Sequence, residues 1–138
     1  MNELEEGTNF IVDFGKLVAI GQKDQQVVPV VLQDADSQAV LFVGYANELA
    51  VRETLKTGRA VLWSTSRDEL WRKGESSGDV LELVDVRVNC EQNSLLYRVR
   101  PRGDGACHTR DDSGRARATC YYRKLSDSDE ALSKLNFV

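Results

Sequence analysis

Alternating apolar and polar positions predict two β-hairpins in this chain. Val27–Leu32 is apolar and rich in β-branched residues, which favours a strand. Asp34–Ser37 holds residue types that are typical of a turn, and Ala39–Tyr45 follows as a second strand. Because the connection is short, we expect these two strands to pair as an antiparallel hairpin.

The longest strand pattern is Val80–Cys90. Its apolar positions change from one face to the other between Leu83 and Val84, so a β-bulge is expected near position 83. Glu91–Asn93 then forms a tight turn, and Ser94–Val99 returns as the partner strand. The cysteine that ends the first strand therefore lies at the tip of this second hairpin.

One helix is clearly marked between the hairpins. Asn47 is a favourable N-cap, and Gly58 is suited to the left-handed conformation that ends many helices. Val51 and Leu55 lie about one turn apart, so we expect both to face the core.

The remaining segments are short or irregular. They comprise a strand at Ala60–Ser64, a polar loop at residues 66–79, a long loop at Arg102–Thr119, a strand at Thr119–Arg123, and a short C-terminal helix capped by Asp127 or Asp129 and ending near Leu135. Together the elements predict an α+β fold with a mainly antiparallel β-sheet and one or two short helices. We expect one domain over residues 1–138, with residues 1–9 flexible and residues 124–138 forming a tail or short helix.

Composition narrows the class of protein. The net charge of −4 argues against general nucleic-acid binding. No apolar run reaches the roughly 18 residues that suggest a membrane span, and the acidic N-terminus is unlike a secretory signal. We therefore expect a cytoplasmic protein with no membrane partner. Eight basic and three acidic residues lie between Arg98 and Lys124. This local excess suits a phosphorylated small molecule, and the alternative is an ordinary solvated loop.

The candidate chemistry is concentrated in a short part of the chain. Residues 90–120 contain all three cysteines and the single histidine (Cys90, Cys107, His108 and Cys120). Three thiolates with one open position describe a catalytic zinc site, whereas a structural site needs four protein ligands. The alternative is that the cysteines are small buried apolar residues, since their spacing contains no Cys-x-x-Cys pair.

These residues stand in segments that resemble one enzyme family. The matching segments are Trp63–Arg67, Leu70–Gly78, Ala106–Thr109 and Cys120–Arg123, with shorter matches at Gln33–Ala35 and Gly44–Asn47. They are similar to the signature of phosphoribosyl-AMP cyclohydrolase over most of the chain, from about Phe14 to Arg123.

The resemblance implies an activity and an assembly. Members of this family catalyse the third step of histidine biosynthesis, in which water opens the purine ring of 1-(5-phosphoribosyl)-AMP between N1 and C6. They are intertwined homodimers, and their zinc is held by cysteines of both subunits. Carried over, Cys90 of one chain and Cys107 and Cys120 of its partner would hold Zn²⁺. The family also binds Mg²⁺ through acidic residues that flank the first of these cysteines.

The resemblance also suggests roles for other residues. His108 would exchange a proton with the attacking water or with a ring nitrogen, a task that suits imidazole near neutral pH. Arg67, Arg72 and Lys73 are candidate phosphate contacts. The substrate-binding loop would continue through residues 74–78, in which backbone amides and side-chain hydroxyls are candidate donors (Gly74, Glu75, Ser76, Ser77 and Gly78).

Two departures from the family pattern stand out. The family carries Asp-Cys-Asp-x-Asp around the first cysteine, whereas this chain has Asn89, Glu91 and Asn93 at the three acidic positions. Since Mg²⁺ prefers carboxylate oxygen, we expect this magnesium site to be weakened. The alternative is that Glu91 and the two amide oxygens hold a metal together with substrate phosphate. The spacing from Cys107 to Cys120 is also longer than in the family, so the extra residues must loop out.

Two further hypotheses stay open at this point. The chain would act on another purine nucleotide if the altered acidic positions changed its substrate. It would instead be a non-catalytic, zinc-stabilised dimer if His108 closed the metal site as a fourth ligand.

Overall fold

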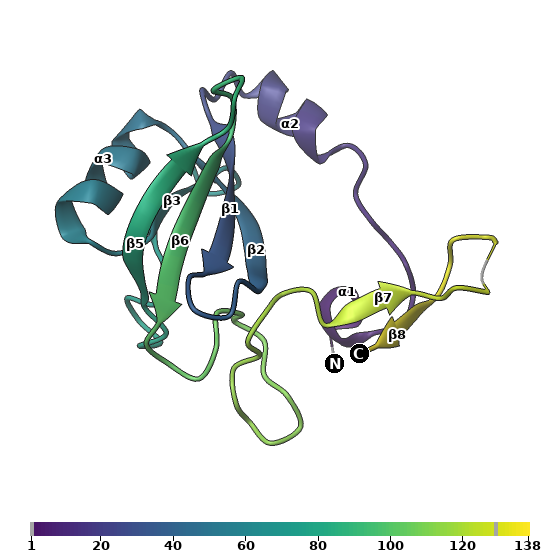
Figure 1. Cartoon of the computed structure of the whole chain (residues 1–138). Coiled ribbons are helices and arrows are strands. Elements are labelled where there is room, and N and C mark those ends of the chain that lie inside the picture. The colour runs from purple at the N-terminus through teal and green to yellow at the C-terminus, as the bar shows by residue number, and fades with distance from the viewer. Residues whose placement is uncertain (1, 129) are drawn as a thin grey trace.

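The central element is a four-stranded sheet made of two hairpins. The structure, a computed structural model, describes residues 2–128 and 130–138. The strands β1 (Val28–Asp34), β2 (Val40–Ala46), β6 (Leu95–Pro101) and β5 (Leu81–Val88) lie in the order β2-β1-β6-β5 (Figure 1). Both expected hairpins are antiparallel, and the parallel pairing of β1 with β6 joins them. The prediction of a mainly antiparallel α+β fold is confirmed.

The expected bulge in the long strand is present. The pairing of β5 with β6 shifts register between Leu83 and Asp85, which leaves Val84 as the extra residue. This residue moves the apolar positions from one face of the strand to the other. The bulge therefore accounts for the change of face that the sequence pattern contains.

Helix α3 (Glu48–Thr57) begins and ends where the sequence predicts. The side chain of Asn47 accepts a hydrogen bond from the backbone N–H of Ala50, and Gly58 has a φ of 71°. The helix lies beside β3 (Val61–Ser64) on one side of the sheet (Figure 1).

The expected core face of α3 is confirmed for Val51 and wrong for Leu55. Val51 is partly buried and packs against the core, whereas Leu55 is exposed and the fully buried positions are Ala50 and Thr54. Small side chains allow the helix to approach β3 closely. The Thr54 hydroxyl donates to the carbonyl of Val61 and accepts from its N–H, so it replaces an apolar contact with two hydrogen bonds.

The expected loop at residues 66–79 contains a strand. Residues Glu69–Arg72 form β4, which pairs with β3 as an antiparallel hairpin. Leu70 and Trp71 pack against the core, and the Trp71 ring lies 5.8 Å from that of Phe42. These two apolar residues, which interrupt an otherwise polar segment, anchor the strand.

The main core lies between the sheet and the layer made of α3 and β3–β4. Its fully buried side chains come from β1, β3, β5 and β6 (Val30, Leu32, Leu62, Leu81, Tyr97 and Val99). Burial of each large aliphatic side chain stabilises the fold by roughly 1.5–3 kcal/mol. The opposite face of the sheet is less covered, and Val43 and Val84 are exposed there.

The two ends of the chain form a separate small unit. Helix α1 (Glu3–Glu6) lies beside the strands β7 (Arg123–Leu125) and β8 (Leu135–Phe137), with the N- and C-termini close together (Figure 1). The N–H of Leu135 donates to the carbonyl of Thr8 at 2.8 Å. The flexibility expected for residues 1–9 stays a prediction, although residues 3–6 are helical.

The C-terminal segment differs from the expectation. The helix predicted to end near Leu135 is wrong, since this residue begins β8 instead. Asp127 caps no helix, and the other proposed cap, Asp129, lies outside the described residues. The strand at Thr119–Arg123 is also displaced, because β7 begins only at Arg123. Pairing with the N-terminal segment supplies hydrogen bonds that a short isolated helix lacks.

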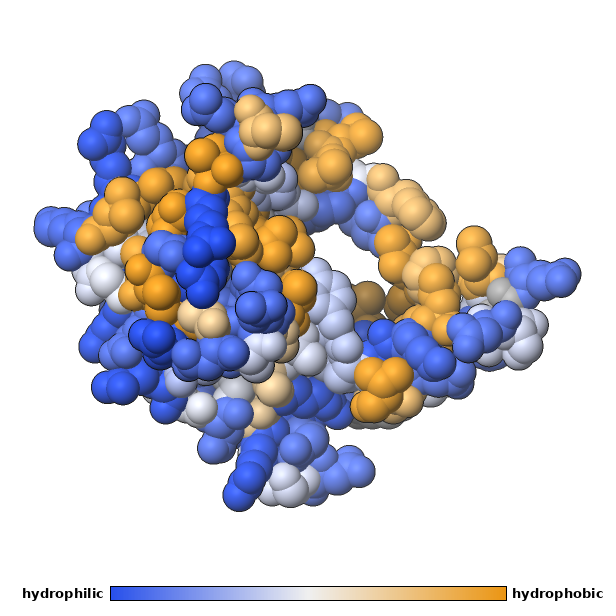
Figure 2. Space-filling view, viewed as in Figure 1, coloured by the Kyte–Doolittle hydropathy of each residue, from blue (hydrophilic) through white to orange (hydrophobic). Residues whose placement is uncertain are grey.

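An exposed arm connects α1 to the sheet. It includes the helix α2 (Lys16–Gln22), which the sequence analysis did not predict. Large apolar side chains along it are exposed (Ile11, Val12, Phe14, Leu17 and Val18). Figure 2 shows the arm standing clear of the sheet, with apolar surface along it. In the described part of the chain, no helix is long and apolar enough to cross a membrane.

Candidate functional site

The structure brings Cys107 and Cys120 together. The N–H of Cys107 donates to the carbonyl of Arg117 at 3.0 Å, which folds the intervening segment back on itself. The N–H of Cys120 donates to the carbonyl of Leu41 at 2.8 Å and fixes the second cysteine to β2. Residues 110–116 loop out as a turn, closed by a bridge between Arg110 and Ala116. The longer spacing is therefore compatible with neighbouring thiols.

The two thiols influence each other. Cys107 is buried, and its sulfur accepts a hydrogen bond from the N–H of Thr109 at 3.4 Å. Burial of the thiol and the adjacent Cys107 sulfur raise the pKa of Cys120 to about 12. Cys120 as a whole residue is exposed, and its thiol lies next to the buried thiol of Cys107. Two neighbouring cysteine sulfurs are suitable ligands for a soft divalent cation.

Lys73 is a buried cation next to this pair. Only 7% of the residue is exposed. Burial lowers the pKa of its ammonium group, and the acidic groups of Asp79, Cys120 and Cys107 oppose that effect. Lys73 is therefore not an ordinary solvated surface lysine. The ammonium group of Lys73 in turn lowers the pKa of Cys120 and so opposes part of its rise.

Cys90 lies apart from the other two cysteines in the single chain. It is exposed and follows β5 at the tip of the β5–β6 hairpin, as expected. Among the described residues, no group of three or more histidine, cysteine, aspartate or glutamate side chains is placed to hold a metal ion. A three-sulfur site therefore requires a cysteine from another molecule.

His108 forms a contact that joins distant parts of the chain. Its Nε2 atom lies 2.6 Å from Oε1 of Glu5, and its side chain is 71% exposed. The hydroxyl of Tyr122 donates to the backbone carbonyl of Glu5 at 2.7 Å, which holds helix α1 at this point. The imidazole is thus oriented by a carboxylate on one side and remains accessible.

His108 faces the segment that was expected to bind substrate. A cavity of about 330 Å³ is lined by His108 and by residues from the β3–β4 turn, from β4 and from the loop after it (Arg67, Glu69, Leu70, Trp71, Arg72, Lys73, Gly74, Glu75, Ser76 and Ser77). Every expected substrate-binding residue except Gly78 lines this cavity. The structure therefore brings the proposed proton-transfer residue and the proposed phosphate-binding loop to one place.

Backbone geometry explains the glycines of this loop. Gly74 has a φ of 80°, and a Cβ atom there would lie only 2.3 Å from the backbone carbon of Asp79. Any larger residue would displace the backbone where the loop turns back. The side-chain hydroxyl of Ser77 accepts from the N–H of Asp79 at 3.2 Å, so this hydroxyl supports the turn.

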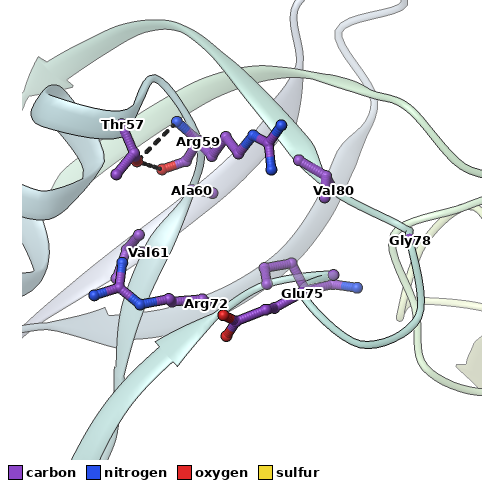
Figure 3. Close-up of a pocket in the computed structure, with 10 residues that line it drawn as sticks. Thr57, Arg59, Ala60, Val61, Arg72, Glu75, Gly78 and Val80 are labelled. Carbon is purple, nitrogen blue, oxygen red and sulfur yellow. Dashed lines mark hydrogen bonds between the residues drawn. The ribbon is translucent and has the colours of Figure 1, made fainter.

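A second and larger cavity lies on the other side of the same loop. Its volume is about 480 Å³, and Arg59 and Arg72 enter from opposite sides (Figure 3). Gly78, Glu75 and Lys73 also line it, but no cysteine or histidine does. We therefore place the chemistry in the first cavity.

The two arginines expected to contact phosphate already have acidic neighbours. Arg67 lies 3.6 Å from Glu69, and Arg72 lies 3.2 Å from Glu53. Both pairs are at least partly exposed, so each contributes little to stability. An incoming phosphate can compete for these guanidinium groups at modest cost.

The three positions at which the family carries aspartate lie together at the hairpin tip. Asn89, Glu91 and Asn93 form hydrogen bonds with one another. They lie beside Cys90, as their sequence positions require. Within the described chain, they belong to no group of three or more acidic, cysteine or histidine side chains that could hold a metal ion.

Sequence reasoning missed the residues that fix the terminal unit to the site. Arg117 makes two hydrogen bonds to the carboxylate of Glu6, at 3.0 and 3.1 Å, and stacks 4.1 Å above the ring of Tyr122. The only signal was the acidic N-terminus together with the basic segment that contains Arg117. Opposite charge on two segments indicates that they attract each other, but it does not identify which residues pair.

Comparison with known proteins identifies the family. The family model for phosphoribosyl-AMP cyclohydrolase matches residues 41–122. This chain belongs to the phosphoribosyl-AMP cyclohydrolase family. The match runs from β2 through both cavity-lining segments and includes Cys107, His108 and Cys120. Members of this family are hydrolases, and the prediction of an enzyme is confirmed.

Individual relatives agree with the family match. A phosphoribosyl-AMP cyclohydrolase of Sphingopyxis alaskensis is 46% identical over 109 residues, which cover 79% of this chain and 80% of the relative. One of Archaeoglobus fulgidus is 45% identical over 107 residues, which cover 78% and 92% respectively. The histidine biosynthesis bifunctional protein HisIE of Thermus thermophilus is 42% identical over 116 residues. This alignment covers 84% of the present chain and 51% of the bifunctional protein.

Proposed function

We propose that this chain hydrolyses 1-(5-phosphoribosyl)-AMP in histidine biosynthesis, with zinc as its cofactor. The observation that carries the proposal is the paired thiols of Cys107 and Cys120, beside a cavity that holds His108 and the expected phosphate-binding loop. The family match extends over the same residues. In the reaction, the oxygen of water is added to C6, the N1–C6 bond breaks, and N1 receives a proton.

The donor set fits zinc rather than a harder metal. Two neighbouring thiols favour a soft divalent cation over Mg²⁺. Cys107 and Cys120 of one subunit and Cys90 of the partner would hold the ion and leave one position open. When bound, zinc supplies a Lewis acid that makes hydroxide available near neutral pH.

The chain's own residues supply proton transfer and binding. His108 accepts a proton from the attacking water and returns one to the ring nitrogen, while Glu5 holds the imidazole in position. Arg67 and Arg72 bind phosphate by exchanging their present acidic neighbours for it. The left-handed turn at Gly74 allows the loop backbone to lie close to the substrate.

A homodimer supplies what the single chain lacks. Cys90 stands alone at an exposed tip, and the arm leaves Phe14 84% exposed. Apolar surface of this extent in a soluble enzyme marks an interaction site. A second copy would cover this surface and would also bring a third sulfur to the Cys107–Cys120 pair.

Mixing of inactive variants tests the shared site. Cys90→Ser and Cys107→Ser should each lose bound zinc and turnover. After the two are unfolded together and refolded, half of the dimers are hybrids with one intact site, so about a quarter of wild-type activity and zinc should return. Activity is followed as opening of the phosphoribosyl-AMP ring, and zinc by elemental analysis.

A second mixture provides the control. Cys107→Ser and Cys120→Ser damage the same half of the site, so their mixture should regain nothing. If the Cys90→Ser and Cys107→Ser mixture also stays inactive and zinc-free, the shared-subunit geometry is wrong. Wild-type protein that retains zinc but leaves phosphoribosyl-AMP intact and opens another purine nucleotide would overturn the proposed substrate instead.

A further inference from the structure

The hairpin tip that carries Cys90 contains a continuous chain of side-chain hydrogen bonds. Oδ1 of Asn89 accepts from the backbone N–H groups of Asn93 and Ser94, both at 2.9 Å. Nδ2 of Asn89 donates to Oδ1 of Asn93 at 2.6 Å. Nδ2 of Asn93 donates to Oε2 of Glu91 at 3.2 Å. We call this chain of contacts the amide relay.

The direction of the relay is fixed by the backbone. Because backbone N–H groups only donate, the atom of Asn89 that meets two of them must be its oxygen. Its NH₂ group then faces Asn93 and requires an oxygen there. The NH₂ group of Asn93 is consequently turned toward the carboxylate of Glu91. No other assignment of the two amides satisfies all of these contacts.

This arrangement does not fit a bound magnesium ion. Mg²⁺ requires six oxygen ligands in near-octahedral geometry and usually takes one or two carboxylates. Here the amide oxygens of Asn89 and Asn93 already accept hydrogen bonds. A donor group from Asn93 occupies one side of the Glu91 carboxylate, and the other two residues of the relay carry no charge. A cation would have to break these hydrogen bonds, and the relay would offer it one negatively charged ligand, the carboxylate of Glu91.

The aspartates of the family pattern and the asparagines of the relay allow side chains 89 and 93 to lie close together in different ways. With aspartates at positions 89 and 93, two carboxylates would replace the amides that now lie 2.6 Å apart. Like charges at that distance require a proton or a cation between them. The asparagines provide a donor facing an acceptor, so the same turn closes without either.

We propose that the amide relay replaces the magnesium ion in this chain, so that Cys90 is positioned and zinc is bound without Mg²⁺. The further expectation that turnover is independent of Mg²⁺ rests on the proposed function. The expectation for zinc occupancy rests on the proposed zinc site as well. The expectation for binding of Mg²⁺ or Mn²⁺ does not, because it concerns only the hairpin and its affinity for a hard divalent cation.

Direct measurement of cation binding tests the proposal. Mn²⁺ serves as a paramagnetic probe for the magnesium site and is titrated into zinc-loaded protein, with free Mn²⁺ followed by electron paramagnetic resonance. Wild-type protein should bind none below the millimolar range. The triple variant Asn89→Asp, Glu91→Asp, Asn93→Asp should bind Mn²⁺ at least tenfold more tightly, and Mg²⁺ should compete.

Wild-type protein alone keeps the test decisive if the triple variant fails to fold. Submillimolar binding of Mn²⁺ to wild type, or zinc content that rises when Mg²⁺ is added, would overturn the proposal. The titration is repeated with AMP, and Glu91→Gln is the control. Binding of Mn²⁺ that needs AMP and disappears in Glu91→Gln would show that the carboxylate and phosphate share a metal, which also contradicts the proposal.

A second variant reports on the relay itself. Asn93→Ala removes the middle of the relay without substituting Cys90. If the relay positions Cys90, zinc occupancy should fall, and added Mg²⁺ should not restore it. Unchanged occupancy in this variant would mean that the relay does not position Cys90. Failure of phosphoribosyl-AMP turnover in every protein, with these binding results intact, would count against the proposed function alone.

Discussion

Oε1 of Glu5 lies 2.6 Å from Nε2 of His108, so the first helix of the chain touches the residue that follows Cys107. The carboxylate side chain is about one-third exposed. The family match begins only at residue 41, so this contact comes from a segment outside it. The relationship gives α1 a role in the site as well as in the terminal unit.

Substitution of Glu5 should impair turnover through His108. In Glu5→Gln the imidazole loses its charged partner, and we expect kcat to fall roughly tenfold while KM stays within about twofold. Glu5→Asp keeps the charge on a shorter side chain and should recover part of the loss. Steady-state kinetics and zinc analysis provide the measurements.

Glu3→Gln is the matched control for this prediction. Glu3 lies on the same helix, but its carboxylate accepts from the side chain of Asn9, whereas His108 is paired with Glu5. Equal losses of kcat in Glu3→Gln and Glu5→Gln would indicate a general effect of α1, and the positioning role of Glu5 would be wrong.

Removal of the imidazole separates catalysis from metal binding. His108→Ala should retain the zinc content of the wild type and lose turnover by roughly 10²–10⁴-fold. The hypothesis of a structural zinc site predicts the opposite result, in which zinc is lost together with its fourth ligand. Cys120→Ser serves as the reference for a variant that loses zinc.

Docking of α1 should weaken in acid. The hydrogen bond from Arg117 holds the pKa of Glu6 below its ordinary value of 4.5. A lowered folded-state pKa means that this contact stabilises docking above about pH 4.5 and is lost as the pH falls through the folded-state value. NMR signals of the amides of residues 3–6 report the loss.

The variant Glu6→Gln gives the comparison for the acid titration. It cannot ionise, so its α1 should be less firmly docked at neutral pH and should show no further change from this group in acid. If wild type and Glu6→Gln follow the same curve, the ion pair with Arg117 does not control docking.

Thr54 should contribute measurably to stability. Its hydroxyl accepts from the N–H of Val61 at 3.0 Å and shares its proton between the carbonyls of Ala50 and Val61. Thr54→Val keeps the volume but removes the hydroxyl that accepts from the buried N–H of Val61, which should cost about 1–3 kcal/mol of unfolding free energy. Thr57→Val, on the exposed side of the same helix, should cost less than about 0.5 kcal/mol. Urea unfolding monitored by circular dichroism provides both values.

Local patterns predicted much of the fold, and long-range contacts account for the rest. The change of face at Leu83 predicted the bulge, because one extra residue is the local way to reverse alternation. Asn47 and Gly58 predicted the helix ends for similar local reasons. The parallel pairing of β1 with β6 left no such signal, since it joins strands that are far apart in sequence.

The candidate site divides in the same way. Cys107 and His108 are adjacent in sequence, and the signature segment around Gly74 forms one cavity wall, so both were accessible to sequence reasoning. The contact of Glu5 with His108 spans 103 residues and could not be predicted from composition. The burial of Lys73 was missed because a lysine in a polar segment is usually solvated.

The pairing of Thr8 with Leu135 gives the molecule a ring-like chain path without a covalent link. Both ends lie at the same place (Figure 1), so a short peptide could join them. New ends could then be opened in the turn at Asp111–Gly114, which projects beyond the Arg110–Ala116 bridge. Circular permutation at that turn would preserve the helix that supports His108 and would relocate any purification tag away from it.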